Sequence, residues 1–171
     1  MATKTENHIY AIIHLYLLLP LITLDDINKE IKQMGYPPVV PKTERPNFYR
    51  IDDGAILRVF PIVNNVFMDP NNPNGAAISA QNVIAIFVPQ RLRGTPSDRT
   101  YSNTELQANI ENSDIGFEPL IENFNVYEID GKWILSVKTT VSQVTKTRLF
   151  DIRGEPIYIV NTAPIPKLKP K

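Results

Sequence analysis

One stretch of the sequence occurs twice, and it constrains the fold more than any other feature. Residues 47–59 and 125–137 share the pattern Asn-x-Tyr-x-Ile-Asp-x-x-x-Ile-Leu-x-Val at a displacement of 78 positions. Self-similarity at a fixed offset is typical of a repeated structural unit. We therefore expect two homologous units in tandem. The matched residues are Asn47, Tyr49, Ile51, Asp52, Ile56, Leu57 and Val59 in the first copy, and Asn125, Tyr127, Ile129, Asp130, Ile134, Leu135 and Val137 in the second.

Each copy has the pattern of a three-stranded antiparallel meander. A short first strand ends at an Asp-Gly pair, Asp53-Gly54 or Asp130-Gly131, and this dipeptide is typical of tight hairpin turns. A long apolar strand follows, and its alternation changes parity near 64–65 in one copy and 142–143 in the other, which indicates a β-bulge. A loop then leads to a third strand, expected over about 76–88 and 155–165.

These patterns predict a mainly β protein. Two tandem homologous three-stranded meanders should pack about a pseudo-two-fold axis as a small barrel or sandwich, because a single meander has one apolar face and nothing to bury it against. We divide the chain into an N-terminal helical segment (1–34), a first β repeat (35–90), a connecting segment (91–115) and a second β repeat with a C-terminal tail (116–171). The N-terminal segment contributes one or two helices.

The clearest helix is expected over 24–34. Thr23 and Asp26 have the spacing of a capping box, and Gly35 can take the left-handed conformation that ends a helix. An apolar stripe at helical spacing must be covered, and we expect this helix to cover one opening or edge of the β structure. The stripe consists of Leu24, Ile27, Ile31 and Met34.

Residues 9–24 are almost continuously apolar, interrupted by His14, Pro20 and Thr23. This length falls at or just below what a membrane-spanning helix needs. Three interpretations stay open: a helix buried against the body or a partner, a membrane anchor, or non-native sequence upstream of a true start at Met34.

Composition argues against several classes of activity. The chain has no cysteine, so disulfides, thiol catalysis and thiolate metal sites are excluded. Lys plus Arg and Asp plus Glu balance at 18 each, so no overall field attracts nucleic acid. The two histidines, His8 and His14, point in different directions on a helix, and no phosphate-binding glycine motif occurs. We predict no catalytic residue, no metal site and no cofactor.

Two groups of residues are candidates for binding. At an offset of 79 the third strands align Asn82 with Asn161, which we expect on the apolar faces, either supporting backbone groups at the bulges or lining a ligand cleft between the copies. Arg91, Arg93 and Arg99 lie in a polar loop that could hold an anion or an RNA phosphate, although exposed arginines are more often simply solvated.

We expect a non-catalytic binding or assembly module that associates with protein, either itself or another chain. The first alternative is a small-barrel nucleic-acid-binding protein that uses the 91–99 loop and the Lys-rich tail. The second is a ligand-binding protein or enzyme with a cleft between the repeats. We expect a cytoplasmic location, with membrane association through 9–24 as the alternative.

Overall fold

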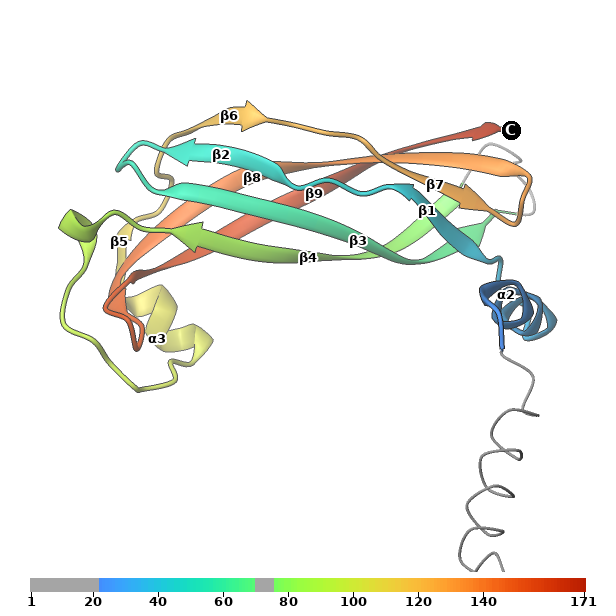
Figure 1. The fold of residues 1–171 in the computed structure, drawn as a ribbon. Coiled ribbons are helices and arrows are strands. Elements are labelled where there is room, and N and C mark those ends of the chain that lie inside the picture. The colour runs from blue at the N-terminus through green and yellow to red at the C-terminus, as the bar shows by residue number, and fades with distance from the viewer. Residues whose placement is uncertain (1–21, 70–75) are drawn as a thin grey trace, which may run out of the picture. The chain divides into compact units, whose positions relative to one another are not determined.

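The computed structural model describes residues 22–69 and 76–171. The described chain is mainly β, with two sheets and two α-helices (Figure 1). It divides into two compact units, Met1–Pro38 and Val39–Lys171. The first contains α2 (Leu24–Gln33), and the second contains every strand, a 3₁₀ turn (Gln90–Leu92) and α3 (Asn103–Ala108).

The helix predicted over 24–34 is confirmed. The Thr23 side chain accepts a hydrogen bond from the Asp26 amide at 3.2 Å, and the Asp26 carboxylate accepts one from the Thr23 amide at 3.1 Å, which completes the capping box. Gly35 has φ +88° just after the helix ends. None of the residues of α2 is buried. The covering role expected for its apolar stripe stays a prediction.

The apolar segment 9–24 lies outside the described residues except for its last three positions. Its three interpretations therefore stay open. Among the helices that the structure describes, none has both the length and the apolar character needed to cross a bilayer.

The strands form two antiparallel sheets. Sheet 1 has the order β4-β3-β2-β6, and its strands are β2 (Asn47–Ile51), β3 (Ile56–Met68), β4 (Ala76–Phe87) and β6 (Phe117–Ile121). Sheet 2 has the order β1-β7-β8-β5, and β9 also pairs with β8 along most of its length. Its strands are β1 (Val39–Thr43), β5 (Ile110–Asn112), β7 (Asn125–Ile129), β8 (Trp133–Phe150) and β9 (Pro156–Pro170).

The short arms that precede the meanders are exchanged between the sheets. β1 pairs with β7, placing Pro41 opposite Tyr127, and β6 pairs with β2, placing Pro119 opposite Tyr49. The sequence repeat did not predict this exchange, because the two meanders were expected to be self-contained. Each arm instead completes the sheet that contains the other copy of the repeated stretch.

Buried polar contacts secure the exchange in corresponding ways. The Tyr49 hydroxyl donates to Glu122 Oε1 at 2.9 Å, and the Tyr127 hydroxyl donates to Glu44 Oε1 at 2.9 Å. The repeated asparagines are buried too, and each side-chain oxygen accepts a backbone amide from the opposite arm: Asn47 from Asn123 at 2.7 Å, and Asn125 from Arg45 at 2.9 Å. The repeated residues Asn47, Tyr49, Asn125 and Tyr127 therefore hold the arms in place.

Two buried apolar clusters contain residues from both sheets. One joins β2 and the N-terminal part of β3 to the C-terminal part of β8. The other joins β7 and the N-terminal part of β8 to the C-terminal part of β3. The hydrogen-bond ladders leave both sheets open within the described chain, so the barrel alternative is wrong. The predicted bulges are present as register shifts between Val63 and Asn65 and between Val141 and Gln143.

The expected alignment of the third strands needs correction. Val63 lies opposite Ala80, whereas Val141, displaced by 78 from Val63, lies opposite Thr162. The position in β9 that corresponds to Ala80 is therefore displaced by 82 rather than 79. The reason is that β8 continues to Phe150 through a further register shift, which delays the turn into β9.

Candidate binding site

β4 and β9 are edge strands with opposite chemical character. In the described chain β4 pairs only with β3, and β9 pairs only with β8, so one backbone edge of each is left open. β9 carries Pro156, Pro164, Pro166 and Pro170 with Lys167 and Lys169, the residue types that block pairing at an edge. Residues 76–88 contain no charge and no proline. Within the described residues, the edge of β4 therefore carries neither of these blocking residue types.

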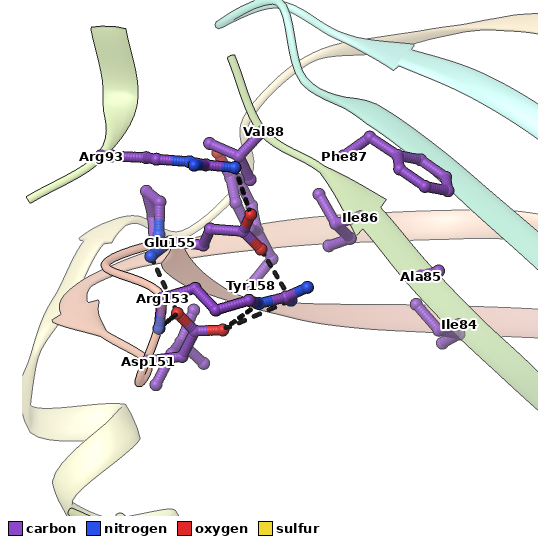
Figure 2. A pocket seen from close by; sticks show the side chains of 12 residues that line it. Ile84, Ala85, Ile86, Phe87, Val88, Arg93, Asp151, Arg153, Glu155 and Tyr158 are labelled. Atoms are coloured by element: carbon purple, nitrogen blue, oxygen red, sulfur yellow. Dashed lines mark hydrogen bonds and ion pairs between the residues drawn. The ribbon is translucent and has the colours of Figure 1, made fainter. Parts of the chain in front are cut away.

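A pocket of about 660 Å³ lies beside the C-terminal half of β4. One wall is the run 84–88, and the opposite wall is the turn from β8 to β9 together with Arg93 (Figure 2). Tyr158 and Ile157 extend the apolar lining. The pocket therefore lies along the open edge of β4 and is lined by both apolar and charged side chains.

The charged wall is an internally neutralised cluster. The Glu155 carboxylate, whose side chain is 9% exposed, accepts from Arg93 at 2.9 Å and from Arg153 at 2.7 Å. Burial acts to raise the pKa of Asp151, but hydrogen bonds from the Glu155 and Arg153 amides and the charge of Arg153 outweigh it and hold that pKa below its usual value. Two cations face two anions, so the pocket has no strong preference for a charged ligand.

Two glycines fix the 3₁₀ segment against the turn. The Gly94 amide donates to the Gly154 carbonyl at 2.9 Å. A Cβ on Gly94 would lie 2.5 to 2.7 Å from atoms of the Phe150 ring. Gly154 has φ +72°, a conformation that favours glycine. The pocket wall that carries Arg93 is thus held by the close approach of the Gly94 and Gly154 backbones.

A second polar cluster lies behind the pocket. Asp53 Oδ2 accepts from the Tyr158 hydroxyl at 2.6 Å and from Lys146 Nζ at 3.2 Å, which joins the β2–β3 turn to sheet 2. Burial acts to raise the pKa of Asp53, but these two groups and the Ala55 amide hold it below its usual value. Burial, and then the Asp53 carboxylate, raise the pKa of Tyr158. Every polar atom of this triad is engaged, which suits a structural joint.

The outer faces of the two sheets differ. On β3 the outward positions include Phe60 and Ile62, whereas the positions displaced by 78 on β8 are Lys138 and Thr140. On β4, Val83 and Phe87 are 49% and 52% exposed. A shallow hollow of about 300 Å³ on the outer side of sheet 1 is lined by Pro46, Arg58, Phe60 and Val83. The apolar outer face of sheet 1 therefore adjoins the open edge of β4.

The three predicted arginines do not converge on one anion site. Arg91 donates to the Asp53 carbonyl, and Arg93 binds Glu155. Arg99 binds Glu105 at 2.8 Å, and its guanidinium lies 5.4 Å from the centre of the Tyr101 ring. Arg93 alone among them lines the pocket.

The two predicted asparagines are not brought together as a pair. Asn82 is partly buried and donates from Nδ2 to Thr162 Oγ1 of β9 at 2.9 Å. Its Oδ1 is inaccessible to solvent and accepts no hydrogen bond from the described chain. Asn161 is exposed and donates to Gln143 Oε1 at 3.0 Å. The corrected register explains this, because Asn161 corresponds to the outward Ser79 rather than to Asn82.

The sequence interpretation missed the edge of β4 and the turn residues of the pocket. The signal for the edge was readable as the absence of charge and proline over 76–88. Nothing in the sequence placed Asp151, Arg153 and Glu155 beside β4, because that contact depends on how the sheets pack. Among the described residues no cluster of side chains is suited to hold a metal ion.

Comparison of this chain with protein-family models, with curated proteins and with solved structures finds no match.

Proposed function

We propose that this chain is a non-catalytic assembly module that associates with protein through the open edge of β4 and the adjoining outer face of sheet 1. The observation that carries the proposal is the contrast between the edges of β4 and β9. An unprotected edge is a ready template for another strand, and proteins ordinarily block such edges with proline, lysine or a covering element. Here β9 has those blocking residues and β4 has none.

The same proposal includes an origin by duplication, with a pseudo-two-fold relation between the copies. The supporting observations are the reciprocal contacts of Tyr49 with Glu122 and of Tyr127 with Glu44, and the matching register shifts in β3 and β8. Within a duplicated fold, differences between copies mark specialisation. Phe60 on β3 corresponds to Lys138 on β8, which is such a difference. Phe60 lies on the outer face of sheet 1, beside β4.

Two alternatives have less support. A nucleic-acid binder needs free cations, but Arg93 and Arg99 are bound to carboxylates. A small-ligand protein or an enzyme would use the pocket beside β4, where Asp151 and Glu155 already accept hydrogen bonds from arginine or backbone.

The test measures the native size of the tagged full chain in a cell extract. We expect the wild type to elute well above the 19.4 kDa of a single chain. The Val83→Lys/Phe87→Lys variant should elute as a single chain, because lysine at an edge opposes strand addition. The matched control is Ala163→Lys/Ile165→Lys on β9, which should keep the wild-type size. A wild type that elutes as one chain, or a β4 variant with unchanged size, contradicts the proposal.

A further inference from the structure

We infer that the partner of the β4 edge is a second copy of the same chain, with two β4 strands paired antiparallel about a two-fold axis at Asn82. This inference rests on the proposed function and specifies its partner. Symmetric dimers are the commonest oligomers of soluble proteins, and their interface pairs one surface patch with itself. Three features of β4 support the inference: the order of its residues by size, the absence of charge over 76–88, and the position of Asn82.

The residues of β4 are ordered by size. The N-terminal half reads Ala-Ala-Ile-Ser-Ala over 76–80, and the C-terminal half reads Val-Ile-Ala-Ile-Phe over 83–87. An antiparallel register centred on Asn82 sets each half against the other. On the outer face Phe87 then lies opposite Ala77, and on the inner face Ile86 lies opposite Ile78. Each large side chain thus faces a small or apolar one, an arrangement that favours cross-strand packing.

The pocket beside β4 suits the same register. Its wall is the run 84–88, which would face residues 76–80 of the second copy. Those residues are mostly alanine and serine, whose small side chains would need little room beside the charged turn. A second β4 strand also suits this edge electrostatically, because neither strand carries a charge that pairing would bury without a partner. A strand rich in lysine or glutamate would desolvate its charges there.

Asn82 lies at the single position that this register maps onto itself. Its Oδ1 is shielded from solvent and has no hydrogen-bond partner in the described chain, an uncommon state for a buried amide. Residues directly opposite each other in an antiparallel pair have Cβ atoms about 4.5–5.5 Å apart. The two Asn82 side chains would therefore be neighbours on the inner face, each keeping its Nδ2 bond to Thr162.

The experiment is a charge exchange at the centre of the proposed interface. Gln81 and Val83 are both exposed, and the register sets Gln81 of one copy opposite Val83 of the other. The Q81K/V83K variant therefore sets lysine against lysine, and the Q81E/V83E variant sets glutamate against glutamate. An equimolar mixture of the two sets lysine against glutamate at both places.

Light scattering coupled to size exclusion should give the purified wild-type chain twice the mass of 19.4 kDa. Each charged variant alone should give the single mass, and the mixture should regain the double mass, which also shows that both variants are folded. The Ala163→Lys/Ile165→Lys control on β9 should keep the double mass.

A wild-type chain of single mass, or a mixture that does not re-form a dimer, overturns the inference. If the purified chain is single but the complex in extract is still lost in the Val83→Lys/Phe87→Lys variant, the proposed function stands and the second copy is the wrong partner. If neither the purified chain nor the chain in extract exceeds the single mass, both fail.

Discussion

At the scale of single residues, the repeated tyrosines and asparagines carry the long-range connections. Tyr49 and Tyr127 are 1% exposed, yet each hydroxyl reaches a glutamate in the arm of the other copy. A buried hydroxyl must find a partner, and a charged acceptor makes the bond stronger than a neutral one. The repeat therefore conserves, between the copies, the residues that hold the sheets together.

Replacing Tyr127 by phenylalanine should lower the free energy of unfolding by about 1.5–3 kcal/mol, because a hydrogen bond to a charged group is lost. Burial, and then the Glu44 carboxylate, raise the pKa of Tyr127 to about 12. A raised folded-state pKa contributes stability that is complete below the unfolded pKa of about 10 and is lost as the pH rises through the folded value. Urea titrations between about pH 9 and 12 should thus show a shallower decline for Tyr127→Phe.

The matched control for this prediction is Tyr36→Phe, at an exposed tyrosine outside the strands. It should leave both the free energy of unfolding at neutral pH and the alkaline decline close to those of the wild type. An equal loss in the two variants would show that the contact with Glu44 contributes nothing.

Gly94→Ala should destabilise the protein by about 1–3 kcal/mol, because the added methyl group would overlap the Phe150 ring. Combining it with Phe150→Leu should cost less than the sum of the two single changes, since the smaller side chain makes room. Thermal unfolding of the four proteins gives this coupling. Strict additivity would mean that Gly94 and Phe150 do not constrain one another.

At the scale of elements, the inner strands of the two long hairpins build the core and the outer strands have an unpaired edge. β3 and β8 supply buried alternate residues to both apolar clusters, while β4 and β9 each pair on one side only in the described chain. The prolines of β9 remove donors that a further strand would need. One hairpin therefore ends in an edge that carries prolines and the other in an edge that carries none.

Removing the block on β9 should make it associate. The Pro164→Thr/Pro166→Thr variant regains two backbone donors along the edge, and we expect increased light scattering on incubation at 37 °C compared with the wild type. Ala163→Thr is the control, because it adds the same side chain without adding a donor. If scattering does not rise in the double variant, the prolines are not what keeps β9 unpaired.

The hairpins also show what local sequence could predict. The Asp-Gly turns, the capping box at Thr23 and the paired bulges all depend on contacts within a few residues, and they are present. The register of β9 depends on how far β8 continues before turning. The turn lies where the Gly94 amide donates to the Gly154 carbonyl, a contact with a distant part of the chain. Aligning the sequence patterns of the two third strands could not predict this register.

At the scale of the whole molecule, the β unit has its own core. The two apolar clusters are built from residues between Val39 and Leu168. Both arms that complete the sheets lie in the same unit, Val39–Lys171. The unit therefore has what a folding domain needs, an interior and strands that close over it.

A chain that begins at Met34 should fold, with a free energy of unfolding within about 1 kcal/mol of the full-length value, because the described core contains no residue before Val39. Urea titration followed by circular dichroism measures this. The matched variant begins at Pro46 and lacks β1, so it should lose the Tyr127–Glu44 bond and unfold at markedly lower urea. A failure of the Met34 chain to fold would show that the N-terminal segment belongs to the core.

The sequence by itself determined that this is a mainly β protein, because hairpin turns, caps, bulges and alternation depend on interactions between near neighbours. The tertiary structure decided the exchange of the arms, the register of β9 and the place of Asp151, Arg153 and Glu155 beside β4. The physical reason is that backbone hydrogen bonds carry no residue identity. Which strand occupies an edge is settled by the side chains that become buried there, and those come from distant parts of the chain.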